Sequence, residues 1–308
     1  MSLAPEIKAF LEAGARAGLP QVWEAPLDVI RRNTQGRTVT SGPVEDVHEV
    51  INRFIPGPTA DLPIRIYRPD NSSESKTVIY FHGGGWVINF LDIYDASLTR
   101  LANQSGATII SVNYQKAPEH PFPIPFDDCY ATLLWVIENA RNLNIDPATI
   151  GVAGDSAGAN LASAVAIKAR DNNIALAFQL LIYPCNDRDF TTDSYLNCAT
   201  GYGLSTQAMQ WFWDQYLQGD HHDDNPYAVP MKAKTFKDIA PAIIITAQYD
   251  PLLSDSQKYG ELLERDGVSV TYKEYAGMIH GFFSNLAVTP TAREAIDFAA
   301  VEIKRLTQ

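Results

Sequence analysis

The chain alternates short, continuous apolar runs with longer stretches in which apolar residues recur every three or four positions. A short apolar run is typical of a strand buried on both faces, whereas the longer spacing is typical of a helix with one buried face. Strands are predicted within TVIYF, ATIISVNY, IGVAG, ALAFQLLIYP, PAIIITAQYD and VSVTYKEYA, and helices at about residues 96–104, 127–142, 157–168, 254–265 and 290–306. This alternation predicts an α/β fold in which helices cover both faces of a mostly parallel sheet.

The first part of the chain follows a different pattern. From about Val44 the segments EDVHEVINRFI and LPIRIYRPD are strand-like, with polar turns between them. Before them, MSLAPEIKAFLEAGARAG predicts an amphipathic helix that has Pro5 in its first turn and Ile7, Phe10 and Leu11 on one side.

A second departure runs from Cys185 to about Asp224, where no core strand is predicted. The stretch STQAMQWFWDQYLQ predicts a helix capped by Ser205. Its large apolar residues are Met209, Trp211, Phe212, Trp213 and Tyr216. Such a cluster packs a core or belongs to an insertion that covers a site on the sheet, and both hold if one face packs while the other lines a pocket.

Size and charge narrow the class of protein. A chain of 308 residues and 34.0 kDa fits one large α/β domain with an inserted piece. The net charge of −12 argues against nucleic acid or an anionic membrane as a partner. No apolar run reaches the length of a membrane span, and the first residues lack the pattern of a secretion signal.

The three cysteines, Cys129, Cys185 and Cys198, lack the spacing of a metal site or a disulfide framework. We therefore expect free thiols and a cytoplasmic location, with a single disulfide as the alternative. The oligomeric state stays open, a homodimer included.

The stretch TIGVAGDSAGANLASAVA carries the strongest chemical signal. Residues 154–158 read G-x-S-x-G between a predicted strand and a predicted helix, which is the context that a nucleophilic serine requires. Small neighbours allow a sharp, strained turn, and the hydroxyl of Ser156 then projects at the N-terminus of the helix. Ser156 is the predicted nucleophile.

A serine nucleophile needs a base and an acid that orients the base, in the chain order serine, acid, histidine on sheets of this kind. Three histidines follow Ser156, and His221 and His222 lie in the acidic stretch GDHHDDN, which predicts a solvated loop. His280 lies after the last predicted strand and is the predicted base.

The acid is predicted from the end of another strand. Asp250 ends the apolar run AIIITAQYD and precedes Pro251, which disfavours helical backbone at Asp250. Asp255 is the near alternative, although a solvated position at a helix start suits it better, and Glu274, inside the last strand, is weaker.

The stretch SKTVIYFHGGGWVINF has three glycines at the exit of a predicted strand. Glycines leave backbone N–H groups uncovered, and the tetrahedral oxyanion formed by serine attack needs such donors. The predicted donors are the Ala157 amide and two amides of the run Gly83, Gly84 and Gly85. His82 is expected to brace this loop by hydrogen bonds. A dinucleotide loop is excluded, because neither glycine stretch reads G-x-G-x-x-G.

Together these residues resemble the hormone-sensitive-lipase-like carboxylesterases, bacterial family IV of the α/β-hydrolase fold. The likeness covers most of the chain and rests on HGGGW, NYQKAPEHPFP, GDSAG, YP, GYGLSTQAMQWFWDQYL, YDPL and HGF, in this order. The resemblance implies an eight-stranded sheet, with catalytic core residues 44–184 and 220–308 and a helical cap from residues 1–43 and 185–219. It also implies Ser156, Asp250 and His280 as the catalytic residues, with no metal or cofactor.

The leading hypothesis is a serine carboxylesterase acting on small-molecule esters with short to medium acyl chains through an acyl-enzyme. The same residues would serve a deacetylase, lactonase or amidase, and a binder that lacks turnover is the alternative outside the enzymes. Candidate pocket residues adjoin a motif or lie in the cap, although large apolar residues also pack cores. They are Trp86, Leu204, Trp211, Leu252, Ile279 and Phe282.

Overall fold

The computed structural model describes residues 2–70, 75–219 and 221–308, so Met1 and residue 220, where the expected cap and second core segment begin, lie outside it. Its centre is a single eight-stranded sheet in the order β1-β2-β4-β3-β5-β6-β7-β8. Only β2 runs against its neighbours. The strands are β1 (Glu49–Pro56), β2 (Asp61–Arg68), β3 (Ser75–Phe81), β4 (Thr108–Val112), β5 (Ile145–Asp155), β6 (Gln179–Ile182), β7 (Ala242–Tyr249) and β8 (Val270–Ile279). The predicted mostly parallel sheet is confirmed.

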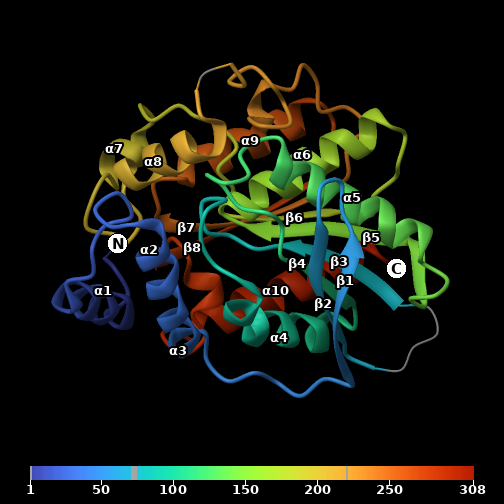
Figure 1. The fold of residues 1–308 in the computed structure, drawn as a ribbon, viewed down its shortest axis with the longest axis horizontal. Helices are drawn as coiled ribbons and strands as arrows, with labels where there is room; N and C mark the ends of the chain where they lie inside the picture. Colours follow the sequence, from blue (N-terminus) through green and yellow to red (C-terminus); the bar gives the residue numbers. More distant parts are fainter. Residues whose placement is uncertain (1, 71–74, 220) are drawn as a thin grey trace.

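Helices cover both faces of this sheet, as Figure 1 shows. On one side lie α4 (Asp95–Ser105) and α10 (Thr291–Leu306), and on the other lie α5 (Ile124–Glu138), α6 (Ala157–Asp171) and α9 (Leu253–Arg265). Strand β3 shows why its apolar run is continuous. Val78 and Tyr80 pack into one core with α4 and α10, whereas Ile79 and Phe81 pack into the other core with α5 and α6.

The predicted helices are confirmed, with small changes at their ends. The largest change is in α5, which begins at Ile124 and ends at Glu138 rather than spanning residues 127–142. Pro125 lies in the first turn, where its missing N–H costs no hydrogen bond. Beyond Glu138 the chain turns toward the next strand.

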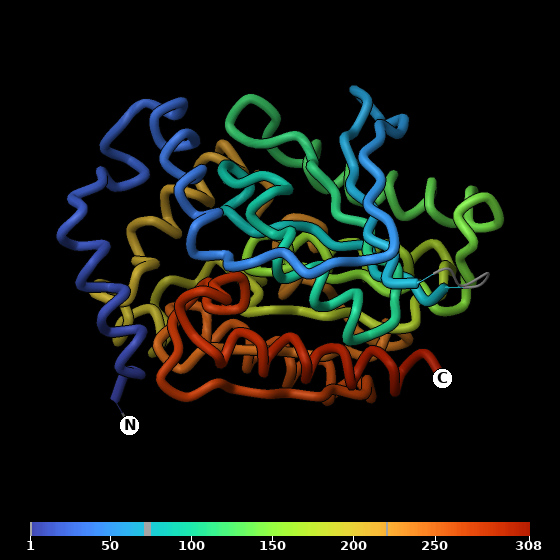
Figure 2. The backbone as a smooth tube through the Cα atoms, turned by 90° about the horizontal axis from the view of Figure 1, so that it is seen from below, coloured from blue at the N-terminus to red at the C-terminus, as the bar shows by residue number. Residues whose placement is uncertain are grey.

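Five further helices gather at one end of the sheet. They are α1 (Pro5–Ala17), α2 (Leu27–Asn33), α3 (Thr38–Ser41), α7 (Asp193–Asn197) and α8 (Thr206–Leu217). Figure 2 shows the N-terminal segment, in blue, beside the yellow segment that holds α7 and α8. As predicted, Pro5 opens α1, and Ser205 caps α8 by accepting a hydrogen bond of 3.1 Å from the Ala208 amide.

Two other expectations concern the whole chain. Cys129, Cys185 and Cys198 are buried and free, as predicted. Within residues 2–70, 75–219 and 221–308, every helix is too short or too polar to cross a lipid bilayer.

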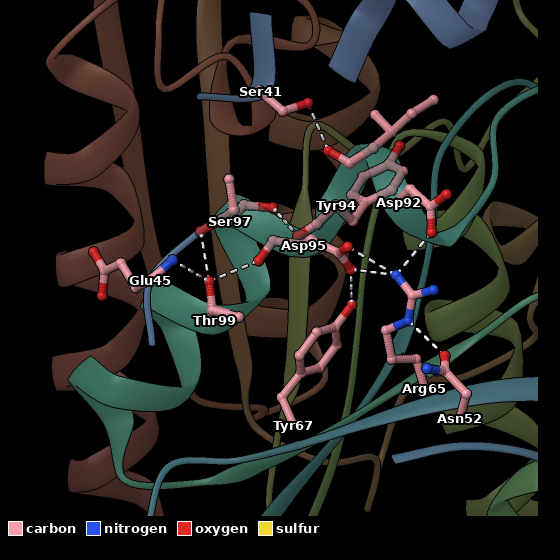
Figure 3. A network of polar contacts seen from close by, with 12 residues as sticks. Ser41, Glu45, Asn52, Arg65, Tyr67, Asp92, Tyr94, Asp95, Ser97 and Thr99 are labelled. Atoms are coloured by element: carbon pink, nitrogen blue, oxygen red, sulfur yellow. Dashed lines mark hydrogen bonds and ion pairs between the residues drawn. The ribbon is translucent and has the colours of Figure 1, made fainter. Parts of the chain in front are cut away.

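A polar network joins β2 to the start of α4 and is drawn in Figure 3. The Asp95 carboxylate accepts two hydrogen bonds from the Arg65 guanidinium, at 2.6 and 2.8 Å, and a third from the Tyr67 hydroxyl. Arg65 also donates to Asn52 and pairs with Asp92. Burial, followed by the charge of Asp95, raises the pKa of Tyr67. Asp95 is therefore the hydrogen-bond acceptor of both a buried hydroxyl and a largely buried cation.

We expect Asp95→Ala to lower the free energy of unfolding by roughly 2 to 4 kcal/mol, because it leaves Tyr67 and Arg65 without their main acceptor. Asp92→Asn is the matched control, since Asp92 touches the same guanidinium with an exposed side chain and should cost under about 1 kcal/mol. Urea unfolding of both variants measures the difference. Equal losses would contradict the role of Asp95.

Candidate active site

Ser156 lies on a tight turn between β5 and α6. Its backbone has φ 55° and ψ −122°, a conformation that costs a non-glycine residue about 1 to 3 kcal/mol. A Cβ at Gly158 would collide with the carbonyl oxygen of Phe81, so a glycine is required there. The structure thus has the strained serine turn that the G-x-S-x-G stretch predicts.

The structure brings Ser156, His280 and Asp250 together. His280 Nε2 lies 2.9 Å from Ser156 Oγ, and His280 Nδ1 lies 2.8 Å from Asp250 Oδ2. A carboxylate only accepts hydrogen bonds, so Nδ1 carries the proton and Nε2 is free to accept from the serine. Asp250 is fully buried, and its other oxygen accepts from the Leu252 amide at 2.9 Å. This arrangement can move a proton from the serine to the imidazole.

The alternative residues lie elsewhere. His221 is exposed, and His222 packs its ring against Phe122 with centroids 4.8 Å apart. Glu274 is exposed on β8.

The expectation of a solvated Asp255 is wrong. Asp255 lies in the first turn of α9, as expected, but it is buried and accepts a hydrogen bond from the Asp187 amide. Burial, and then the nearby charge of Asp187, raise the pKa of Asp255 well above its usual range. Asp255 is therefore buried because of its position next to the loop that holds Asp250, and its place at the start of a helix does not make it solvated.

The three amides of the glycine run differ in whether they have a hydrogen-bond acceptor. Gly83 donates its amide to Asp155 Oδ1 at 2.8 Å, so the expectation that Gly83 is an oxyanion donor is not met in this structure. The amides of Gly84 and Gly85 donate no hydrogen bond within the described part of the chain, and both residues line the cavity over Ser156. Ala157 is the first residue of α6, where an amide has no partner inside the helix.

Asp155 is the functional residue that sequence reasoning missed. Besides the Gly83 amide, its carboxyl group accepts from the hydroxyls of Tyr80 at 2.9 Å and Tyr94 at 3.1 Å. Burial raises its pKa. The signal was present, because Asp155 is the variable position of G-x-S-x-G, but its partners come from distant segments. Asp155 joins the glycine loop to the serine turn.

Comparisons with known proteins identify the family of the chain. A family model described as the α/β hydrolase fold matches residues 78–284. The chain is 36% identical to esterase LipI of Mycobacterium tuberculosis over 274 residues, which cover 87% of this chain and 85% of that protein. This chain belongs to the hormone-sensitive-lipase-like α/β hydrolases.

Two further relatives bear on the activity of this esterase. Carboxylesterase NlhH of M. tuberculosis is 38% identical over 250 residues, covering 80% of this chain and 78% of that protein. The solved structure of ester-hydrolase EH1AB1 from the metagenome of Lake Arreo matches with a TM-score of 0.95 and 36% identity, covering 98% of both chains. The predicted family and class are confirmed, and the protein is a carboxylic ester hydrolase.

A cavity of about 400 Å³ lies over Ser156. Of the predicted pocket residues, Leu204 and Ile279 line it. The other four lie outside it: Trp86 is stacked on Tyr216, Leu252 and Phe282 are fully buried in the core, and Trp211 packs against Phe212 and the core. Complete burial is the lowest free-energy position for large apolar side chains, and size alone does not tell a core wall from a pocket wall.

The cavity wall also contains residues that were not among the predicted pocket residues. Helix α8 gives Ala208, Met209 and Phe212, which share one face, while Trp213 and Tyr216 turn into the core. Both interpretations of the aromatic stretch therefore hold. The N-terminal segment adds Phe10, Leu19, Pro20, Gln21, Val22, Ile30, Asn33, Thr34 and Arg37.

His82 braces the glycine loop, as predicted. It is fully buried, and its Nδ1 lies 2.8 Å from the carbonyl oxygen of Gly83, to which it donates. Its ring stacks on Tyr114 with centroids 4.6 Å apart. Burial lowers the pKa of His82 to about 3, so the ring is neutral in the folded protein at neutral pH.

This neutral histidine makes stability depend on pH. Below its ordinary pKa of 6.5, His82 takes up a proton in the unfolded chain but not in the folded one until the pH approaches 3. Acidification from pH 7 to pH 5 should therefore remove about 2 kcal/mol through His82 alone.

His82→Asn keeps an N–H donor for Gly83 and removes the titration, so its stability should fall about 2 kcal/mol less than that of the wild type over this range. Denaturant unfolding at pH 7, 6 and 5 checks the difference. Parallel pH profiles of the two proteins would exclude a neutral, buried His82.

Proposed function

We propose that this esterase acts through an acyl-enzyme formed on Ser156. His280 Nε2 takes the proton of Ser156 Oγ as the oxygen attacks the ester carbonyl carbon, and Asp250 stabilises the imidazolium. Collapse of the tetrahedral species breaks the bond to the alcohol oxygen, which leaves with the proton from His280. Water then attacks the acyl carbonyl, giving its proton to His280, and Ser156 recovers a proton as the carboxylic acid departs.

The amides of Gly84, Gly85 and Ala157 are the proposed donors to the oxyanion. The support is that Gly84 and Gly85 line the same cavity as Ser156, and that Ala157 follows Ser156 as the first residue of α6. None of the three amides donates to an acceptor within the described residues. Each donor of this kind is worth about 3 kcal/mol in the transition state, because it is held in place before charge develops.

We further propose that residues 1–43 and 185–219 form a cap that shapes the substrate site. The support is that these segments supply much of the wall over Ser156. A volume of about 400 Å³ suits short to medium acyl chains, since small-molecule pockets begin near 300 Å³.

The observation that carries the proposal is the pair of hydrogen bonds joining Ser156, His280 and Asp250. The test is hydrolysis of 4-nitrophenyl esters from acetyl to decanoyl, with mass spectrometry of the quenched enzyme. We expect turnover to be fastest for the shorter chains and an acyl group to be found on the peptide that contains Ser156. Turnover with an acyl group on another residue would refute the mechanism.

A phosphonate ester gives an independent check, because its tetrahedral phosphorus resembles the proposed intermediate. The Lake Arreo relative was solved in complex with a derivative of bipyridine phosphonate. Adding amide and lactone substrates to the panel distinguishes an esterase from an amidase or lactonase with the same residues.

A further inference from the structure

Arg37 lies in the wall of the cavity over Ser156, at the end of the one-turn helix Thr34–Arg37. Its Nη1 lies 3.3 Å from Asn89 Oδ1, and its Nη2 lies 4.0 Å from the point where a Cβ would stand at Gly281. Asn89 in turn donates to the carbonyl oxygen of Gly83, and Gly281 follows His280. The guanidinium therefore lies between the glycine loop and the histidine.

Arg37 differs from the other arginines of the same segment. Arg31 forms a bidentate pair with Glu119, and Arg32 pairs with Asp28 one helical turn away. Arg37 forms no ion pair with a carboxylate among the residues that the structure describes, and within them its side chain donates to Asn89 alone.

The one carboxylate in the cavity wall among the described residues forms no ion pair with Arg37. Asp155 also borders the cavity, but its oxygens already receive three hydrogen bonds from Tyr80, Gly83 and Tyr94. No other lysine or arginine among the described residues lines this cavity. The wall of the cavity thus holds one guanidinium, most of whose N–H donors have no acceptor among the described residues.

We propose that this esterase selects esters that carry a carboxylate, and that Arg37 binds this group. The proposal rests on the function proposed above. A planar guanidinium matches a carboxylate through two parallel hydrogen bonds, and its weak hydration suits a partly apolar site. Arg37 is then a specificity-determining residue, while the bond that breaks remains the ester bond at Ser156.

The net charge of the protein opposes this selection only weakly. A charge of −12 repels an anion in solution, but interactions between exposed charges are largely screened beyond about 8 to 10 Å at physiological ionic strength. Inside the cavity, Arg37 is the one lysine or arginine among the described lining residues. Because Arg37 is an exposed residue, we expect a moderate preference rather than an absolute one.

The carboxylate can belong to the acid or to the alcohol of the ester, and two pairs of substrates distinguish these cases. On the acyl side, monoethyl adipate is compared with its neutral carbamoyl analogue, ethyl 5-carbamoylpentanoate. On the alcohol side, 4-acetoxybutanoate is compared with 4-acetoxybutanamide. The measured quantity is the ratio of kcat/KM for the charged and neutral members of each pair.

We expect Arg37→Gln to lower this ratio about tenfold in at least one pair, the size of one charge-assisted interaction. Arg37→Lys keeps the positive charge but loses the two parallel N–H donors of the guanidinium, so we expect a smaller decrease in this ratio. Arg32→Gln is the matched control, because it removes one positive charge from the same segment outside the cavity, and its ratio should equal that of the wild type.

Ratios that are equal in the wild type and in both Arg37 variants, with all four esters hydrolysed, would overturn the role of Arg37 and leave the proposed function intact. A drop in Arg32→Gln as large as that in Arg37→Gln would also overturn it, because the effect would then come from overall charge. If the wild type hydrolyses none of the four esters and does not hydrolyse 4-nitrophenyl acetate either, the proposed function is refuted instead.

Discussion

Ser156→Ala should lower kcat for 4-nitrophenyl acetate by about 10⁴-fold to 10⁶-fold while the protein stays folded. The hydroxyl of Ser156 is the atom that His280 Nε2 approaches at 2.9 Å, and alanine offers no oxygen to form the acyl-enzyme. Any residual rate would come from water attack beside the remaining amides. Steady-state kinetics and mass spectrometry of the quenched protein, which should carry no acyl group, measure the effect.

Ser284→Ala is the matched control for this result. Ser284 lines the same cavity, and its hydroxyl donates to the carbonyl oxygen of Gly281 at 3.3 Å, away from the serine turn. Its loss should change kcat by roughly tenfold at most, a cost of about 1.4 kcal/mol. A Ser156→Ala protein that keeps more than about a tenth of the wild-type kcat would rule out Ser156 as the nucleophile.

The second large effect is expected for Asp250→Asn, which should lower kcat by about 10³-fold to 10⁴-fold. Asp250 Oδ2 accepts from His280 Nδ1 at 2.8 Å and thereby leaves Nε2 unprotonated toward Ser156. An asparagine amide can present N–H groups to Nδ1, which favours the wrong tautomer, and it lacks the charge that stabilises the imidazolium.

Asp255→Asn distinguishes the loss of the Asp250 carboxylate from a general disturbance of the loop that holds Asp250. Asp255 is five residues further along the chain and buried, and its raised pKa favours the neutral acid, which asparagine resembles in size. Its kcat should stay within roughly threefold of the wild type. If Asp255→Asn instead lost as much activity as Asp250→Asn, the orienting acid would have to be reassigned.

Local sequence was sufficient to place the three residues of the proposed triad. Ser156 stands in a five-residue motif whose strand and helix flanks are visible in the hydropathy pattern. Asp250 and His280 follow the carboxyl ends of neighbouring strands β7 and β8, and parallel strands bring such ends to one edge of the sheet. The distances among these side chains, however, depend on the conformations of the loops after β7 and β8 together.

Local sequence was insufficient where one residue competes with another for a partner. Gly83 has a backbone amide like those of Gly84 and Gly85. The Gly83 amide, however, donates a hydrogen bond to Asp155, which comes from another strand. Trp86 and Phe212 both have large aromatic side chains, but one is stacked in the core and the other lines the cavity.

The sequence by itself therefore determined the order of strands and helices, the strained serine turn and the residues of the proposed triad, because each depends on residues a few positions apart or on the rule that the carboxyl ends of parallel strands share one edge. Only the tertiary structure decided which amides stay free, which apolar side chains face the substrate, and that Arg37 reaches the cavity without a carboxylate partner in the described chain. These properties depend on distances between segments that lie far apart in the chain, and hydropathy reports the burial of a residue without reporting its neighbours.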